Sequence, residues 1–206
     1  MAQLFHIHPD NPQLRLINQA RELIRKGGVI VYPTDSSYAL ACQLEDKKAL
    51  DRIRRIRNLD DRHNFTLVCK DLAQISNYTK IGNDAYRMIK SMTPGPFTFI
   101  LKGTREVPRR LLHPSRKSIG VRIPDNVIAQ ALLTALDAPL FSTTLILPGE
   151  NESPFDPEDI RDRLQKEVDL IIDGGYIIYE PTTIILLSEG APEVVRKGKG
   201  QAPALV

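Results

Sequence analysis

A buried strand that runs into four small polar residues is the part of this sequence best suited to holding a ligand. The β-branched stretch from Val29 to Tyr32 is typical of a strand inside a sheet. Pro33 has no backbone N–H to give to a central ladder, so we expect the strand to end there. Thr34 to Ser37 then supply hydroxyl and carboxylate groups at a strand end, where α/β proteins often bind ligands. The same residue types favour ordinary capping turns, and the sequence leaves both interpretations open.

Positive charge is concentrated in segments, although the net charge is only +3. Between Lys102 and Arg122 there are seven basic residues and one acid, Glu106, whereas Glu150 to Asp173 holds nine acids and three bases. Further basic residues cluster in a predicted helix: Arg52, Arg54, Arg55, Arg57 and Arg62. Such segments are candidates for binding an anion locally, and a solvated surface is the alternative for any one of them.

The composition predicts one cytoplasmic domain spanning residues 1–206, with 42% hydrophobic residues to form its core. We find no apolar run long enough for a membrane span and no signal peptide, so no membrane partner is expected. Cys42 and Cys69 are interpreted as buried free thiols of a reducing compartment. The four histidines are scattered without ligand partners at suitable spacing, so no metal site is expected.

Hydrophobic periodicity predicts helices and strands in alternation, with several strands close together. The predicted helices cover 10–27, 47–57, 72–76, 83–92, 126–136 and 158–166. The predicted strands cover 4–8, 29–32, 65–69, 97–101, 118–123, 140–143, 168–172, 182–187 and 194–196. This order favours an α/β fold with a mixed sheet and helices on its faces over a regular doubly wound fold. The sequence contains neither a glycine-rich dinucleotide fingerprint nor a P-loop, so a bound nucleotide must be held in another way.

Five segments, in order along the chain, resemble the signature motifs of the YrdC-like (threonylcarbamoyl-AMP synthase-like) family. Pro33 to Leu40 is similar to the family's P-T-D-T-x-Y-G-L, and Pro94 to Leu101 to its P-G-P-x-T-x-I-L. Ile119 to Asp125 is similar to V-G-V-R-x-P, while 181–184 and 196–198 stand where the family has P-S-T-[IV] and R-x-G. Together they cover nearly the whole chain, which looks like the YciO branch of this family.

The resemblance implies a twisted mixed sheet with a basic concave surface. The family's enzymes condense threonine, bicarbonate and ATP into threonylcarbamoyl-AMP, the donor for a tRNA adenosine modification. The resemblance therefore allows ATP and Mg²⁺ as cofactors here. The residues that it places near a threonine-like ligand are Thr34, Arg122, Ser142 and Thr182. Those that it places near a nucleotide are Arg55, Arg57, Ser118, Thr144 and Arg196.

Departures from the family motifs bear on catalysis. The K-x-R motif is best matched by Arg55 to Arg57, so the lysine is an arginine, and the proline that follows is Asn58. The N-P-L motif is best matched by residues 64–66, which requires a small insertion around 60–62, and the asparagine of S-x-N is replaced by Ile146. Ala39 replaces a glycine, and Cys69 a frequent histidine. Losing one donor from a preorganised site costs roughly 10²–10³ in rate, although an active enzyme with a rearranged site remains an alternative.

We therefore expect a protein that binds RNA and an adenine nucleotide on a basic concave surface. The residues expected to contact RNA are Arg54, Arg109, Arg110, Arg116 and Lys117. The chain lacks the interleaved aromatic residues of single-strand readers, which favours a duplex or a folded tRNA. The alternative is an L-threonylcarbamoyladenylate synthase, acting ahead of tRNA modification on threonine, bicarbonate and ATP. A third interpretation is a protein that binds small molecules and no RNA.

Arg122 is the residue most strongly expected to hold an anionic ligand. It follows Ile119 to Val121, a stretch that predicts a buried strand, and a rigid guanidinium there suits a bidentate grip on a carboxylate or phosphate. The alternative is a buried ion pair with Asp35 or Asp125.

Overall fold

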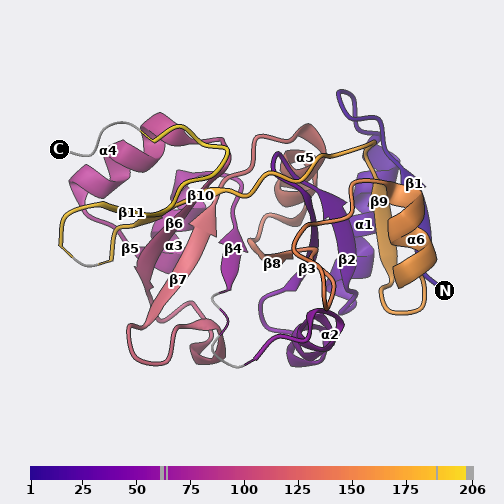
Figure 1. Ribbon diagram of the computed structural model, residues 1–206, viewed down its shortest axis with the longest axis horizontal. Helices are drawn as coiled ribbons and strands as arrows, with labels where there is room; N and C mark the ends of the chain where they lie inside the picture. The colour runs from indigo at the N-terminus through magenta and orange to yellow at the C-terminus, as the bar shows by residue number, and fades with distance from the viewer. Residues whose placement is uncertain (61–62, 64, 189, 203–206) are drawn as a thin grey trace.

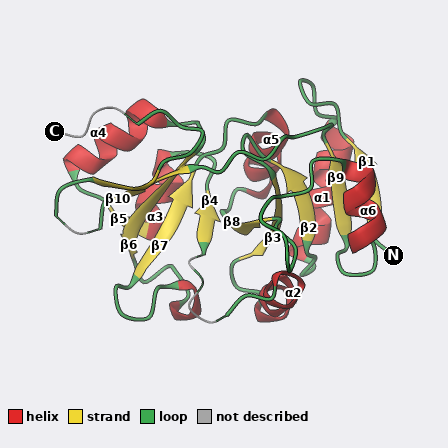
Figure 2. Ribbon diagram, in the orientation of Figure 1, coloured by secondary structure: helices red, strands yellow, loops and turns green. Residues whose placement is uncertain are grey.

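The computed structural model describes residues 1–60, 63, 65–188 and 190–202. Its strands form one sheet of 11 strands that spans the width of the molecule (Figures 1 and 2). The sheet order is β1-β9-β2-β3-β8-β4-β7-β6-β10-β11, with β5 paired to β6. The strands are β1 (Gln3–His6), β2 (Ile30–Pro33), β3 (Tyr38–Gln43), β4 (Thr66–Val68), β5 (Thr79–Lys80), β6 (Phe97–Gly103), β7 (Ser118–Arg122), β8 (Leu140–Thr144), β9 (Leu170–Asp173), β10 (Thr183–Leu186) and β11 (Glu193–Arg196).

Helices cover both faces of this sheet. They are α1 (Leu14–Arg25), α2 (Lys47–Arg57), α3 (Leu72–Tyr78), α4 (Asn83–Met92), α5 (Val127–Leu136) and α6 (Pro157–Leu164), with a 3₁₀ turn, η1, at Arg109–Leu111. Apolar residues of α1 and α5 pack with β1, β2, β9 and part of β3 in one core cluster. Residues of α2, α3, α4 and α6 belong to a larger cluster. It also contains the strand residues that point to the other face of the sheet. The two clusters identify the two covered faces.

Parallel and antiparallel pairs occur in the same sheet, which confirms the predicted mixed α/β fold. Strand β9 pairs in parallel with β1 and β2, and β4 with β7. Strand β3 is antiparallel to both β2 and β8, and β6 is antiparallel to β7. No helix in the described part of the chain is long and apolar enough to cross a membrane. Cys42 and Cys69 are both buried and free, as predicted.

Strand β3 is the main element that the sequence analysis missed. Its residues are almost entirely buried, so it shows no alternation of apolar and polar side chains. Its two alanines also have weak strand preference. Strand β1 ends at His6, not at His8, and α1 begins at Leu14 rather than near Asp10. The reason is local: the His8 ring nitrogen accepts hydrogen bonds from the Asp10 and Asn11 backbone and forms a turn before the helix.

Polar residues alternate along the central strands, and this pattern decides where the sheet is left open. Val121 and Phe99 join the large apolar cluster, whereas their chain neighbours Arg122 and Thr98 point to the opposite face. On that face the cluster around α1 and α5 reaches Val68 of β4 but includes no residue of β7, β6 or β10. A hollow therefore lies beside α5 on the sheet surface.

Candidate functional site

The hollow is a cavity of about 310 Å³ on this face of the sheet. It is rich in arginine and hydroxyl side chains, and among the described residues that line it there is no carboxylate. The lining residues are Ser37, Ala39, Arg57, His63, Thr66, Val68, Thr98, Arg122, Ser142, Thr143, Thr144, Ile146, Tyr179, Thr182, Ile184 and Arg196. A cavity of this size and character suits a small polar anion.

The floor of the cavity follows the register of three neighbouring strands. Ser142 of β8 lies opposite Thr66 of β4, and Thr66 lies opposite Gly120 of β7. A Cβ atom at position 120 would lie 2.9 Å from Thr66 Oγ1 and 3.2 Å from Thr98 Cγ2. Gly120 therefore allows these two threonines to approach one another across β7.

Arg122 reaches the cavity from the end of β7 and is held by the turn after β2. Its Nη2 forms an ion pair with Asp35, and the two side chains are only 9% and 8% exposed. Nη1 donates to Ser36 Oγ at 3.2 Å, while Asp35 Oδ2 accepts from the Asp125 backbone at 2.9 Å. The ion-pair alternative is thus present in the structure. Arg122 also lines the cavity, and its Nε has no hydrogen-bond partner among the described residues.

Arg57 comes from the last turn of α2 and braces the segment after β8. Its Nε donates to the Ile146 carbonyl at 2.8 Å and its Nη1 to Thr143 Oγ1 at 2.6 Å. Burial lowers the pKa of this guanidinium from its ordinary value. Because both contacts are to uncharged acceptors, the positive charge of Arg57 is not neutralised by them.

Arg196 lines the cavity from the end of β11. Its Nε and Nη2 donate to the Thr182 carbonyl at 3.1 and 2.8 Å, and Nη2 also contacts Thr182 Oγ1 at 3.2 Å. Thr182 Oγ1 is in turn 2.8 Å from Thr98 Oγ1. This chain of contacts orients the guanidinium and two hydroxyls together.

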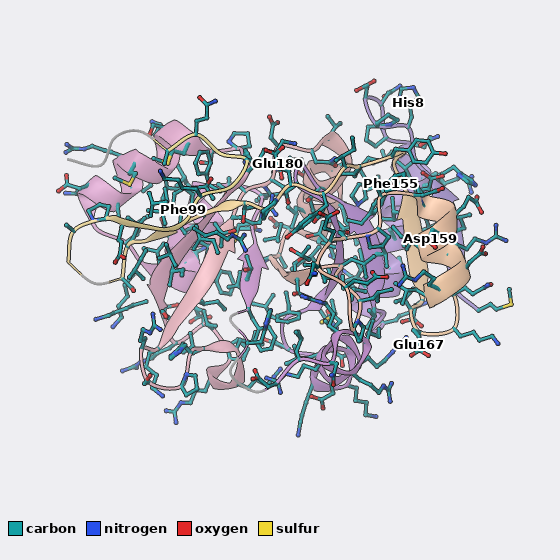
Figure 3. All side chains as sticks on the ribbon, viewed as in Figure 1. His8, Phe99, Phe155, Asp159, Glu167 and Glu180 are labelled. Carbon is teal, nitrogen blue, oxygen red and sulfur yellow. The ribbon has the colours of Figure 1, made fainter. Side chains whose placement is uncertain are left out.

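The segment between β9 and β10, residues 174–182, connects two strands that lie near opposite ends of the sheet (Figure 1). Figure 3 labels Glu180 on it, near the middle of the molecule. The Glu180 backbone N–H donates to the Ser36 carbonyl at 2.9 Å, and Tyr179 lines the cavity. The Lys199 ammonium donates to the Asp35 carbonyl at 2.6 Å. Both contacts attach later parts of the chain to the turn after β2.

Thr34 serves that turn and does not line the cavity. Its Oγ1 donates to the Ser37 carbonyl at 2.7 Å and accepts from the Ser36 and Ser37 backbone at 3.2 Å. The stretch is therefore a tight turn between β2 and β3 and not a helix cap. Ser37, which the sequence analysis placed in the same polar stretch without assigning it to a ligand, lines the cavity instead.

Of the other residues predicted to contact ligands, the structure gathers six and leaves two apart. The six that line the cavity are Arg57, Arg122, Ser142, Thr144, Thr182 and Arg196. Arg55 is exposed on α2, and Ser118 is buried at the opposite end of β7 from Arg122; neither lines the cavity. Thr98, Thr143 and Tyr179 were missed. Thr98 could have been predicted from the sequence, because it is the threonine of the motif at Pro94 to Leu101.

The residues predicted to contact RNA fall into two groups. Arg54 lies 5.0 Å over the Phe65 ring, and Arg110 donates to the carbonyls of Leu44 and Glu45. These two side chains therefore support local structure. Arg110 is nevertheless exposed, as are Arg109, Arg116 and Lys117. A separate groove of about 680 Å³ is lined by Lys80, Gly103, Thr104, Arg105, Val107, Arg109, Leu112 and Lys117.

His63 borders the cavity in a segment where the sequence suggested an insertion. Burial and the nearby Arg57 lower the pKa of its imidazole, while Asp60 acts in the opposite direction. Arg62 and Asn64, which the sequence analysis singled out, lie outside the described residues. No group of three or more histidine, cysteine or acidic side chains arranged to hold a metal occurs in the part of the chain that the structure describes.

The α/β sheet thus gathers arginine and hydroxyl side chains around one cavity. A sequence model of the Sua5/YciO/YrdC family, described as telomere recombination, matches residues 22–198. The chain therefore belongs to this family.

The similar proteins include one close group and more distant enzymes. YciO of Escherichia coli (strain K12), described as uncharacterized, is 62% identical over 200 residues, 97% of each chain. A crystal structure of E. coli YciO has a TM-score of 0.96, at 60% identity and full coverage of both chains. A putative threonylcarbamoyl-AMP synthase of Methanocaldococcus jannaschii is 27% identical over 89% of this chain and 86% of its own.

One structure of a distant relative contains an amino acid. Sua5 of P. abyssi, solved in complex with L-threonine, has a TM-score of 0.87 at 25% identity. The match covers 95% of this chain and 57% of that one. The shared part confirms the fold expected from the sequence motifs.

Proposed function

We propose that the cavity binds a threonine-like amino acid and an adenine nucleotide. The observation that carries this proposal is the set of three arginines, Arg57, Arg122 and Arg196, around a cavity whose described lining residues include no carboxylate. Fixed guanidinium groups bind carboxylates and phosphates through paired hydrogen bonds. The family relationship supports the choice of ligands, because a relative of this fold is solved with L-threonine.

Binding of Mg²⁺ by the described lining residues has little support. Hard cations of this type take oxygen ligands, chiefly carboxylates and phosphates. Since no carboxylate occurs among those residues, a magnesium ion would be held through the phosphates of the nucleotide.

Calorimetric titration with ATP, with L-threonine and with both together tests the proposal. Arg196→Gln should weaken ATP binding by roughly 10-fold to 100-fold, the range of a lost charge-assisted hydrogen bond. Arg109→Gln is the matched control, because Arg109 is exposed and does not line the cavity. Absence of binding of either ligand, or an equal loss in both variants, would contradict the proposal.

Synthesis of threonylcarbamoyl-AMP is a further step that we expect to be slow in this chain. The family's lysine is represented by Arg55, which is exposed outside the cavity, and the family's amide by the apolar Ile146. Charge that develops during attack on the α-phosphate therefore lacks two of its usual donors. Incubation with ATP, threonine and bicarbonate, assayed for pyrophosphate and the adenylate against P. abyssi Sua5, measures this. A rate equal to that enzyme's would show that the rearranged site is fully active.

RNA binding is a second candidate, carried by the basic groove around Arg109 and Lys117. Lys80 and Arg105 also line this groove, which has about 680 Å³ of space and no acidic lining residue among those described. Contacts to phosphates would make affinity fall with salt, at roughly 0.7–0.9 log unit per log salt for each neutralised phosphate. The buried free cysteines are consistent with a reducing, cytoplasmic setting for such a partner.

Titration of a tRNA and of duplex RNA at several salt concentrations tests the second candidate. An Arg109→Gln/Lys117→Gln variant should bind more weakly and show a smaller salt slope. Arg15→Gln, on the exposed side of α1, is the control. Binding that does not change with salt would rule out this groove as a phosphate-binding surface.

A further inference from the structure

A buried pair of hydroxyls lies behind the cavity. The Tyr32 hydroxyl is 2.8 Å from Ser142 Oγ, and Tyr32 is fully buried on β2. Ser142 lines the cavity, whereas Tyr32 does not. Strand β3 runs between β2 and β8, with Ala39 opposite Tyr32 and Ala41 opposite Ser142. Because both β3 residues are alanines, the tyrosine ring has room to cross β3 and reach Ser142.

The proton donors in this pair can be assigned from their partners. Ser142 Oγ also lies 3.2 Å from the Leu40 carbonyl, which accepts hydrogen bonds and cannot donate them. The single proton of Ser142 is therefore directed to Leu40, and Tyr32 must donate its phenol proton to Ser142. Burial raises the pKa of Tyr32 to about 12, so the phenol keeps that proton at neutral pH.

This assignment gives Ser142 a defined polarity toward the cavity. The Ser142 hydroxyl donates its proton to the Leu40 carbonyl and accepts the Tyr32 proton at one of its two acceptor positions. The other acceptor position is therefore free. Ser142 as a residue is 4% exposed, and it lines the cavity. In a cavity dominated by arginine donors, Ser142 thus presents an acceptor to a ligand.

We infer that Tyr32 is a positioning residue that fixes Ser142 as the acceptor for the amine N–H of a bound amino acid. The inference rests on the proposed function and deepens it by naming how the amine is recognised. Arg122 stands on the same face, two residues beyond Gly120, and only β4 separates β8 from β7. Two strand spacings across the sheet and two residues along it separate the two Cα atoms by about 12 Å, and the long Arg122 side chain shortens that gap. One amino acid can then place its carboxylate near Arg122 and its amine near Ser142.

The test compares two ligands that differ only in the amine. L-Threonine and 3-hydroxybutanoate share the carboxylate and the hydroxyl, and the second lacks the amine. Ligand-observed NMR titration of the full chain measures both dissociation constants. Tyr32→Phe should raise the dissociation constant of L-threonine by between about twofold and tenfold. It should leave the dissociation constant of 3-hydroxybutanoate unchanged. In a Ser142→Ala background, Tyr32→Phe should have no further effect on threonine.

Tyr38→Phe is the matched control, since Tyr38 is a second buried phenol, bonded to Gly175 and Gly174 and absent from the cavity lining. It should leave the ratio of the two dissociation constants as in the parent. Tyr32 is only structural, and the inference is wrong, if Tyr32→Phe weakens the binding of both ligands equally. The same conclusion follows if Tyr32→Phe still weakens threonine binding in the Ser142→Ala background. A parent protein that binds threonine and 3-hydroxybutanoate equally also overturns the inference but leaves the proposed function standing. A parent protein that binds no amino acid overturns both.

Discussion

Arg122 combines a structural contact with a place in the cavity, so its two roles must be separated by variants. Breaking its buried pair with Asp35 from either side should destabilise the fold by roughly 3–5 kcal/mol, because one charge is left without its partner. We therefore expect Arg122→Gln and Asp35→Asn each to lower stability. The double variant should lose less than the sum of the two.

Urea unfolding measures these stabilities, and threonine titration of the folded fraction measures the ligand role. Arg122→Gln should abolish binding, while Asp35→Asn, which keeps the guanidinium, should retain it. Additive stability losses would argue against a coupled pair. Unchanged threonine affinity in folded Arg122→Gln would limit this residue to a structural role.

The pKa of His63 is lowered from 6.5 in the folded protein, and this predicts a pH dependence of stability. Its imidazole faces Arg57 and lies 5.5 Å from the Phe65 ring, while Asp60 partly opposes the shift. As the pH falls below 6.5, the unfolded chain takes up a proton that the folded chain resists. The free energy of unfolding should therefore decrease with falling pH in that window and show no contribution from His63 above it.

Thermal unfolding from pH 5 to pH 8 checks this, at intervals that bracket the ordinary histidine value. His63→Gln should reduce the slope below pH 6.5. An identical slope in His63→Gln and the parent would contradict the prediction.

At the scale of elements, the end of α2 explains one departure from the family motif. Asn58 ends this helix with φ 51° and ψ 46°, in the left-handed region. Proline, the residue expected there from the resemblance to the family motif, is locked near φ −65° and has no N–H. The Asn58 N–H donates to the Arg55 carbonyl at 3.2 Å. Restoring the family residue is thus incompatible with the way this helix ends.

Asn58→Pro should accordingly destabilise the protein by about 3 kcal/mol and displace Arg57, the next residue back. Asn58→Gly should stay within about 1 kcal/mol of the parent, because glycine adopts this conformation freely. Urea unfolding and ATP titration of both variants provide the measurement. A proline variant as stable as the parent would mean that α2 can end in another conformation.

At the scale of the whole molecule, burial predicts the reactivity of both cysteines. Burial raises the pKa of Cys42 to about 12 and also raises that of Cys69. Since the thiolate is the reactive form, neither should react with a disulfide reagent at pH 8 while the chain is folded. In denaturing urea, both should react at once. Labelling kinetics followed by mass spectrometry measures this, and fast labelling of either thiol in the native state would show a local opening.

The sequence predicted the mixed fold and most elements because their patterns are local. Helices such as α2 and α5 carry apolar residues at helical spacing, and their bounds were predicted almost to the residue. Strand β3 was not predicted, because burial on both faces removes the alternation of apolar and polar side chains on which a strand prediction depends. Six of the nine residues predicted for the two ligands meet in the cavity, and four of them, Arg122, Thr144, Thr182 and Arg196, lie at or next to strand ends.

The sequence by itself determined which residue types this protein has available for binding anions and where most strands and helices lie. Only the tertiary structure decided which of those side chains share a surface and which partners they have. Ser142 and Arg122 belong to one site because β4 lies between β8 and β7, an order that no local pattern encodes. Arg122 meets Asp35, and Tyr32 meets Ser142, across strands far apart in the chain. Periodicity is a property of neighbours along the chain, whereas pairing depends on the register of distant strands.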